Sequence, residues 1–148
     1  MNQSVYVEQG DDLVEIELVS EHFSIDESAI DATLCQMGKL ILDYGTIEAE
    51  VKLREGRLAA ELERVGALLD KTVRDDLLAK GEKLTEARVA HGITLDQNYQ
   101  AYVAALNQAR RDVAMMKWAM SALINKSECL RAYAYRENQS LKADSRTP

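Results

Sequence analysis

The sequence predicts a mainly α-helical protein, a long antiparallel helical hairpin with coiled-coil seams that assembles into an oligomer. A short, acidic, β-like or extended arm is expected at its N-terminus. Residues 94–138 contain no glycine or proline, and apolar residues recur in them every seven positions. Ala, Leu, Glu, Lys and Arg dominate the composition and aromatic residues make up only 5%, which is typical of long helices. At about 1.5 Å per residue this helix would span roughly 65 Å, and its apolar face therefore needs a partner of equal length.

Two apolar series with a period of seven define the seam of the helix expected over residues 94–138. They are Tyr99, Leu106, Val113 and Met120, and Tyr102, Ala109, Met116, Leu123 and Leu130. Offset by three, they occupy the a and d positions of a heptad. Thr94 followed by Gln97 predicts a capping box at the start of the helix.

Trp118 falls at heptad position f, opposite this seam. There it either packs on a third element, which would be residues 85–91 or a neighbouring subunit, or it offers a stacking surface. The residues that we expect in the seam or in an oligomer contact are Leu106, Val113, Met116, Trp118, Met120 and Leu123.

Another long helix is predicted ahead of this one, starting near Asp26, where Ser24 and Glu27 form a capping-box pair. Its apolar stripe slips in phase after Tyr44, and several glycines interrupt it, each costing about 1 kcal/mol relative to alanine. A break near Gly45 is therefore an alternative to one continuous helix, although we favour continuity with a bend. The stripe consists of Ile30, Leu34, Met37, Ile41, Tyr44, Ile47, Val51, Leu58, Leu62, Val65 and Leu69.

The chain divides into three expected parts, an acidic arm over residues 1–23, a helical hairpin domain over 24–138 and a disordered tail over 139–148. Only the arm alternates apolar and polar residues, with Gly10 in a plausible turn. A β-hairpin fits this pattern, and so does an extended arm that orders only in an assembly. In either form we expect the arm to be separable from the helices. Between Gly81 and Gly92, Thr85 is expected to cap a short helical connector.

Residue types argue against catalysis, and charge argues against one kind of nucleic-acid binding. His22 and His91 lie far apart, and Cys35 and Cys129 have no metal-type spacing and are expected to be buried free thiols. We expect no enzyme activity, no cofactor, no bound metal and no membrane span. Residues 1–51 carry twelve acidic residues and a single basic one, and the net charge of the chain is −7. This overall acidity argues against indiscriminate duplex binding.

Basic residues cluster in two places that suit a single nucleic-acid strand. In the first helix they alternate with glutamates, so a solvated face of ion pairs is an equally good interpretation. Near the end of the second helix they alternate with aromatic residues, which could stack on bases or pack at the helix end. The nucleic-acid-binding residues that we expect are Lys52, Arg54, Arg57, Arg64, Arg131, Tyr133 and Arg136.

Over roughly residues 13–137 the order of features resembles the phage UvsY-type recombination mediators. The features are Phe23-Ser24-Ile25-Asp26, Glu48-Ala49-Glu50, Arg57-Leu58, Trp118 and Leu130-Arg131-Ala132. In that family a Lys-Ala-Arg-Leu segment contacts DNA; the matching residues here are Glu55-Gly56-Arg57-Leu58, so the arginine carries over and the lysine does not.

The resemblance implies a homo-oligomeric, single-stranded-DNA-binding mediator that helps load a phage recombinase in the cytoplasm of an infected bacterium. Its partners would be single-stranded DNA, the recombinase, a single-strand-binding protein and other copies of the chain. Two other functions fit the residues, a phage structural or assembly protein without DNA contact, and an inhibitor whose residues 8–31 imitate the charge of a nucleic acid.

Overall fold

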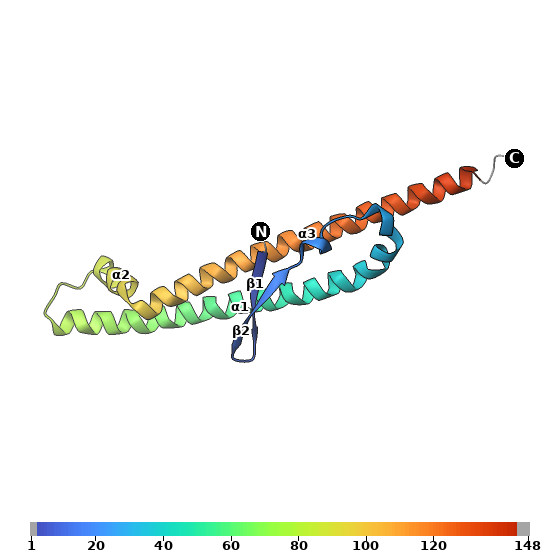
Figure 1. Ribbon diagram of the computed structural model, residues 1–148. Helices are drawn as coiled ribbons and strands as arrows, with labels where there is room; N and C mark the ends of the chain where they lie inside the picture. Colours follow the sequence, from blue (N-terminus) through green and yellow to red (C-terminus); the bar gives the residue numbers. More distant parts are fainter. Residues whose placement is uncertain (1–2, 145–148) are drawn as a thin grey trace. The chain divides into compact units, whose positions relative to one another are not determined.

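The computed structural model describes residues 3–144, and it is mainly helical with a small N-terminal sheet (Figure 1). Strands β1 (Gln3–Gln9) and β2 (Asp12–Leu18) pair antiparallel through a two-residue loop. Gly10 opens this loop with φ +65, as the first position of a type II′ turn requires. Of the two structures that the N-terminal pattern allowed, the β-hairpin is therefore the one formed.

Three helices follow, α1 (Ile30–Ala79), α2 (Glu86–Leu95) and α3 (Gln97–Asp144). Helix α1 is continuous through Gly45 and Gly56, which confirms the favoured interpretation. Helix α3 runs on to Asp144, so residues 139–144 are helical where the unpatterned sequence predicted disorder. The rest of that predicted tail, residues 145–148, lies outside the described residues.

The helix caps differ from the two predicted capping boxes. Asp26, not Ser24, accepts from the backbone N–H of Ser28 at 2.9 Å, and a 3-10 turn then leads into α1 at Ile30. Asp96 accepts from the backbone N–H of Tyr99 at 2.8 Å and so caps α3. Aspartate is as good an N-cap as serine or threonine, and each aspartate stands two residues closer to its helix than the predicted cap.

The connector cap at Thr85 is confirmed, since its side chain accepts from the backbone N–H of Arg88 at 3.3 Å. Thr94, the other predicted cap, belongs instead to α2, where its hydroxyl donates to the carbonyl of His91 at 2.8 Å. Gly92 also lies inside α2 and does not end it. The connector is therefore a helix of ten residues.

The described chain divides into two compact units. Unit 1 takes the residues up to Val51 and those from Asp112 onward, and unit 2 is Lys52–Arg111. The core of unit 1 joins the β-hairpin, the start of α1 and the later part of α3. Its buried members are Val5, Val7, Leu18, Ile30, Met37, Tyr44, Val51, Val113, Met116, Ala119, Leu123 and Leu130.

The N-terminal hairpin packs into this core and is not the separable arm expected from the sequence. Val5 and Val7 are 0% and 2% exposed, while Val14 and Ile16 on the paired strand pack against the cluster. A two-stranded ribbon is marginally stable alone, so burying its apolar face on the helices is what stabilises it. The acidic side chains Glu15 and Glu17 project from the opposite, exposed face, as strand alternation requires.

Unit 2 contains the turn of the helical hairpin. Glu55 and Arg110 form an ion pair at 3.7 Å, and a Cβ at Gly66 would lie 3.6 Å from the ring of Tyr99. From the first contact to the second, the residue number rises on α1 and falls on α3. The two segments therefore run antiparallel within this unit. Its buried apolar residues are Val65, Val89, Leu106 and Ala109.

Candidate nucleic-acid interface

The basic residues predicted on α1 do not share one exposed face. Arg57 and Lys52 are exposed, whereas Arg54 is only 6% exposed. Three residues correspond to about 300° around a helix, which is enough to place Arg54 at the buried seam and Arg57 on its flank. Arg54, one of the expected nucleic-acid-binding residues, therefore shares no exposed surface with Arg57 and has a structural position.

Arginines of unit 2 are largely engaged with local carboxylates. Arg64 donates to Glu61 at 2.7 Å, as the ion-pair interpretation of this segment requires. Arg74 binds Asp70 and Glu86, each at 2.7 Å, and these hydrogen bonds raise the pKa of its guanidinium. Each such pair lowers the positive charge available to a phosphate, so the surface of α1 around Arg64 and Arg74 is poorly suited to bind DNA. Further ion pairs in the unit join Arg88 to Glu82 and Arg110 to Glu55.

The basic and aromatic residues at the end of α3 are better placed. Arg131 and Arg136 are exposed, and Tyr135 between them is 66% exposed. Tyr133, the aromatic residue that the sequence singled out, is half-buried and packs against the core of unit 1. Of these two rings, Tyr135 is therefore the one open to solvent. The same alternating segment contained it, and the helical period alone could have separated it from Tyr133.

An exposed row on α3 extends this site. Arg131, Tyr135, Asn138 and Lys142 are spaced by four, three and four residues, so they lie on one face of the helix. Gln139 donates to the phenol oxygen of Tyr135 at 2.8 Å, and Asn138 donates to the carbonyl of Ala134 at 2.9 Å. We call the four residues Arg131, Tyr135, Asn138 and Lys142 the α3 row.

The residues predicted for the seam are mostly buried by their own chain. Met116 and Leu123 are 0% exposed and Val113 is 7% exposed in unit 1, while Met120 is half-buried against the same core. Leu106 is 4% exposed in unit 2. Burial within one chain accounts for the apolar period, and an oligomer contact through these residues stays a prediction.

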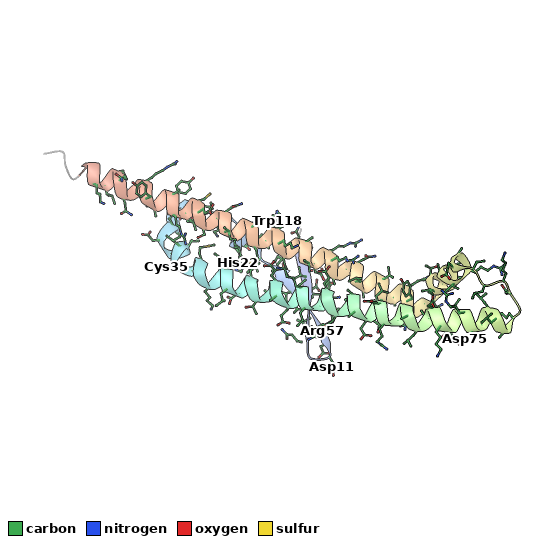
Figure 2. The ribbon with its side chains drawn as sticks, turned by 180° about the vertical axis from the view of Figure 1, so that it is seen from behind. Asp11, His22, Cys35, Arg57, Asp75 and Trp118 are labelled. Carbon is green, nitrogen blue, oxygen red and sulfur yellow. The ribbon has the colours of Figure 1, made fainter. Side chains whose placement is uncertain are left out.

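Trp118 packs on a third element, one of the two interpretations that its heptad position allowed. That element is the segment after β2, which Trp118 contacts through Phe23. Trp118 lies on α3 (Figure 2). The ring centroids are 5.6 Å apart at an interplanar angle of 45°, and Trp118 remains 56% exposed. A cavity of about 240 Å³ lies beside the two rings. It is lined by Gln3, Leu18, Ser20, Phe23 and Trp118, and we call it the Trp118 pocket.

Polar contacts hold the segment that carries Phe23. Lys126, 6% exposed, donates to the carbonyl oxygen of His22 at 2.9 Å. The Nδ1 atom of His22 lies 3.0 Å from the hydroxyl of Tyr44, and burial raises the pKa of that phenol. Burial lowers the pKa of the Lys126 ammonium. These contacts from α1 and α3 fix residues 20–23 and so place Phe23 against Trp118.

Within residues 3–144, no group of three or more His, Cys, Asp or Glu side chains could hold a metal ion. Cys35 and Cys129 are free and exposed, so the prediction that they are buried is wrong. No helix in the described part of the chain is long and apolar enough to span a membrane. The chain matches no family model, no curated protein and no solved structure.

Proposed function

We propose that this chain is a non-enzymatic, self-associating helical protein that binds single-stranded DNA and helps load a recombinase onto it. The observation that carries the proposal is the exposure of Tyr135 next to Arg131 and Arg136 on α3. Base stacking on an aromatic ring flanked by cationic side chains is how proteins hold single strands without reading sequence. The loading of a recombinase comes from the family resemblance alone.

The α3 row has a suitable length for this contact. From Arg131 to Lys142 it covers about 16 Å at 1.5 Å per residue, which equals about five bases at the 3.4 Å rise of one strand. Arg131 and Lys142 would contact phosphates near the two ends, with the ring of Tyr135 between them. A few such contacts bind weakly, so the proposal requires several copies of the row on one strand.

Self-association supplies those copies. Large apolar side chains stay exposed along α1. A contact between α1 and other subunits would cover them. In an oligomer, a strand that is bound to one α3 row has a high effective concentration at the α3 rows of the other subunits. That arrangement would allow binding in spite of the net charge of −7. The exposed apolar residues of α1 are Leu42, Leu53, Leu68 and Leu78.

The test is fluorescence polarisation with a labelled oligothymidine over a series of salt concentrations. The double variant Arg131→Gln with Lys142→Gln removes both phosphate contacts of the α3 row. It should flatten the plot of log affinity against log salt by about 1.4, since each lost phosphate contact contributes about 0.7 for a single strand. Its control, Lys80→Gln with Lys83→Gln, removes the same charge from exposed residues between α1 and α2 and should leave the slope unchanged.

Stacking is tested separately. Tyr135→Ala should cost about 1–3 kcal/mol of binding free energy, while Leu141→Ala, which removes a 66% exposed side chain of the same helix, should cost little. Equal losses in both, or no binding by the unaltered protein at low salt, would refute the DNA contact.

A second candidate is an assembly protein without DNA contact, and the ion pairs of unit 2 together with buried Arg54 favour it. Sedimentation of the unaltered protein with and without the oligonucleotide separates the two. A stable oligomer that leaves the oligonucleotide behind would support this second function.

A further inference from the structure

A polar cavity of about 400 Å³ lies in unit 1, where the segment after β2 meets α1 and α3. Its walls come from residues 21–26 of that segment, from one face of α1 over residues 33–40 and from Lys126 of α3. A second cavity of similar volume adjoins it, since His22 and two residues of α1 line both. We call the first of them the Lys126 cavity. It shares no lining residue with the Trp118 pocket, and its volume is within the range of small-molecule sites.

The ammonium group of Lys126 is buried in the wall of this cavity without a carboxylate partner. The residue is 6% exposed and donates a hydrogen bond to the carbonyl oxygen of His22 at 2.9 Å. Among the side chains that the structure describes, none forms an ion pair with Lys126. An ammonium group has three N–H donors, and a buried charge is normally paired because its desolvation is costly. Lys126 therefore still has charge and donors to offer to an anionic group in the cavity.

Two carboxylates line the same cavity and do not pair with Lys126. Hydrogen bonds from Ser28 lower the pKa of the Asp26 carboxyl. The backbone N–H of Glu21 and then the hydroxyl of Ser20 lower the pKa of the Glu21 carboxyl. Both groups are therefore ionised at neutral pH, and both residues are exposed. The wall thus carries one positive and two negative groups that are held apart from each other.

Charges of both signs decide between the possible ligands. A simple anion such as phosphate would be attracted by Lys126 but repelled by Glu21 and Asp26. A metal ion or another simple cation would meet the reverse arrangement. A zwitterion carries one group of each sign, so it can pair with both parts of the wall. The α-amino acids are small zwitterions of this kind, with an ammonium and a carboxylate on one carbon atom.

We propose that the Lys126 cavity binds a free α-amino acid, with its carboxylate on the ammonium of Lys126 and its ammonium on Glu21 and Asp26. The bound molecule would join residues 21–26 to both long helices, and so hold the segment that connects the β-hairpin to α1. A ligand that binds the folded state alone stabilises it by mass action. The inference goes beyond the proposed DNA binding and does not depend on it, because the cavity and the α3 row share no residue.

Thermal unfolding of the full chain with each of the standard L-amino acids tests the proposal. At about 100 times its Kd, a ligand should raise the Tm of a chain of this size by about 5–11 °C. Two derivatives of the amino acid that binds best serve as controls, the amide, which lacks the carboxylate, and the N-acetyl form, which lacks the ammonium. Neither derivative should shift the Tm. Titration calorimetry should show one molecule bound per chain.

Matched variants locate the ligand. Lys126→Met removes the ammonium, keeps the length of the side chain and should abolish the shift. Glu21→Gln with Asp26→Asn should weaken binding about tenfold or more, and asparagine preserves the helix cap. The control Asp11→Asn with Asp12→Asn removes the same charge from the exposed turn of the β-hairpin and should leave the affinity unchanged. Helicity by circular dichroism verifies that each variant is folded.

Several results would overturn the proposal. The absence of a shift with any amino acid at millimolar concentration would exclude this ligand class. A full shift with the N-acetyl derivative would make the cavity an anion site, and a full shift with the amide would make it a cation site. A shift that folded Lys126→Met retains would place the ligand elsewhere. If that variant does not fold, the two derivatives still decide the question on the unaltered protein.

Discussion

Replacing Gly92 by alanine should destabilise the protein, although alanine is the better helix former. Gly92 lies inside α2, where the usual exchange to alanine gains about 1 kcal/mol of helix propensity. A Cβ built on Gly92, however, would lie 2.7 Å from Cγ1 and 3.1 Å from Cγ2 of Val73 on α1. Valine is stiff at χ1, so the side chain cannot turn away, and α2 would have to move from α1 within unit 2.

The magnitude follows from two opposing terms. Overpacking a contact of this kind costs about 1–3 kcal/mol, against the propensity gain of about 1 kcal/mol, so Gly92→Ala should be neutral to about 2 kcal/mol destabilising. Gly56 is the matched control, because it lies inside α1 and a Cβ there meets no atom within 4 Å. Gly56→Ala should therefore stabilise by about 1 kcal/mol.

Thermal unfolding followed by circular dichroism measures both variants. For a chain of this size 1 kcal/mol corresponds to about 2–4 °C in Tm, so the two variants should differ by roughly 2–12 °C with Gly56→Ala the higher. The double variant Gly92→Ala with Val73→Ala should be more stable than the sum of the single changes predicts, because the clash is gone. A Gly92→Ala variant as stabilised as Gly56→Ala would refute the close approach of α2 to α1.

Three further predictions follow from burial and charge. Leu123→Ala, at a fully buried position, should cost about 2–5 kcal/mol in a denaturant titration, whereas Leu141→Ala on the same helix should cost under about 0.5 kcal/mol; equal costs would contradict the core described for unit 1. Arg54→Ala should lower Tm and leave the salt dependence of DNA binding unchanged, because the side chain is buried; a flatter salt slope would instead place Arg54 in the interface. Hydrogen bonds from Arg74 lower the pKa of Asp70, although desolvation opposes the shift. The folded state therefore binds fewer protons than the unfolded state, and the ion pair stabilises the folded protein at pH values above the unfolded pKa of Asp70. The Tm difference between the protein and Arg74→Ala should thus be largest near neutral pH, shrink as pH falls through the lowered pKa of Asp70, and be small throughout since the pair is on the surface.

Local sequence signals predicted the elements of this fold. The absence of glycine and proline from residues 94–138 and the recurring apolar residues indicated two long helices, and both are present. Met37, Tyr44 and Val51 follow one another every seven residues and all are buried. Such features depend on residues within a few turns, since helical period and side-chain spacing are local properties. The caps at Asp26 and Asp96 were missed because several neighbouring polar residues could each serve.

The candidate sites depended on contacts that the sequence does not contain. The period-2 pattern showed that the N-terminal segment has an apolar face, but only the packing of Val5 and Val7 on the helices made it part of the core. Residue type likewise made Arg54 a candidate for DNA binding, and only the structure shows that it is buried. Periodicity placed Trp118 opposite the seam without naming Phe23, which lies far away in the sequence. A periodic pattern specifies which face of an element is apolar, whereas the tertiary structure decides what covers that face, because burial is a property of both surfaces in contact.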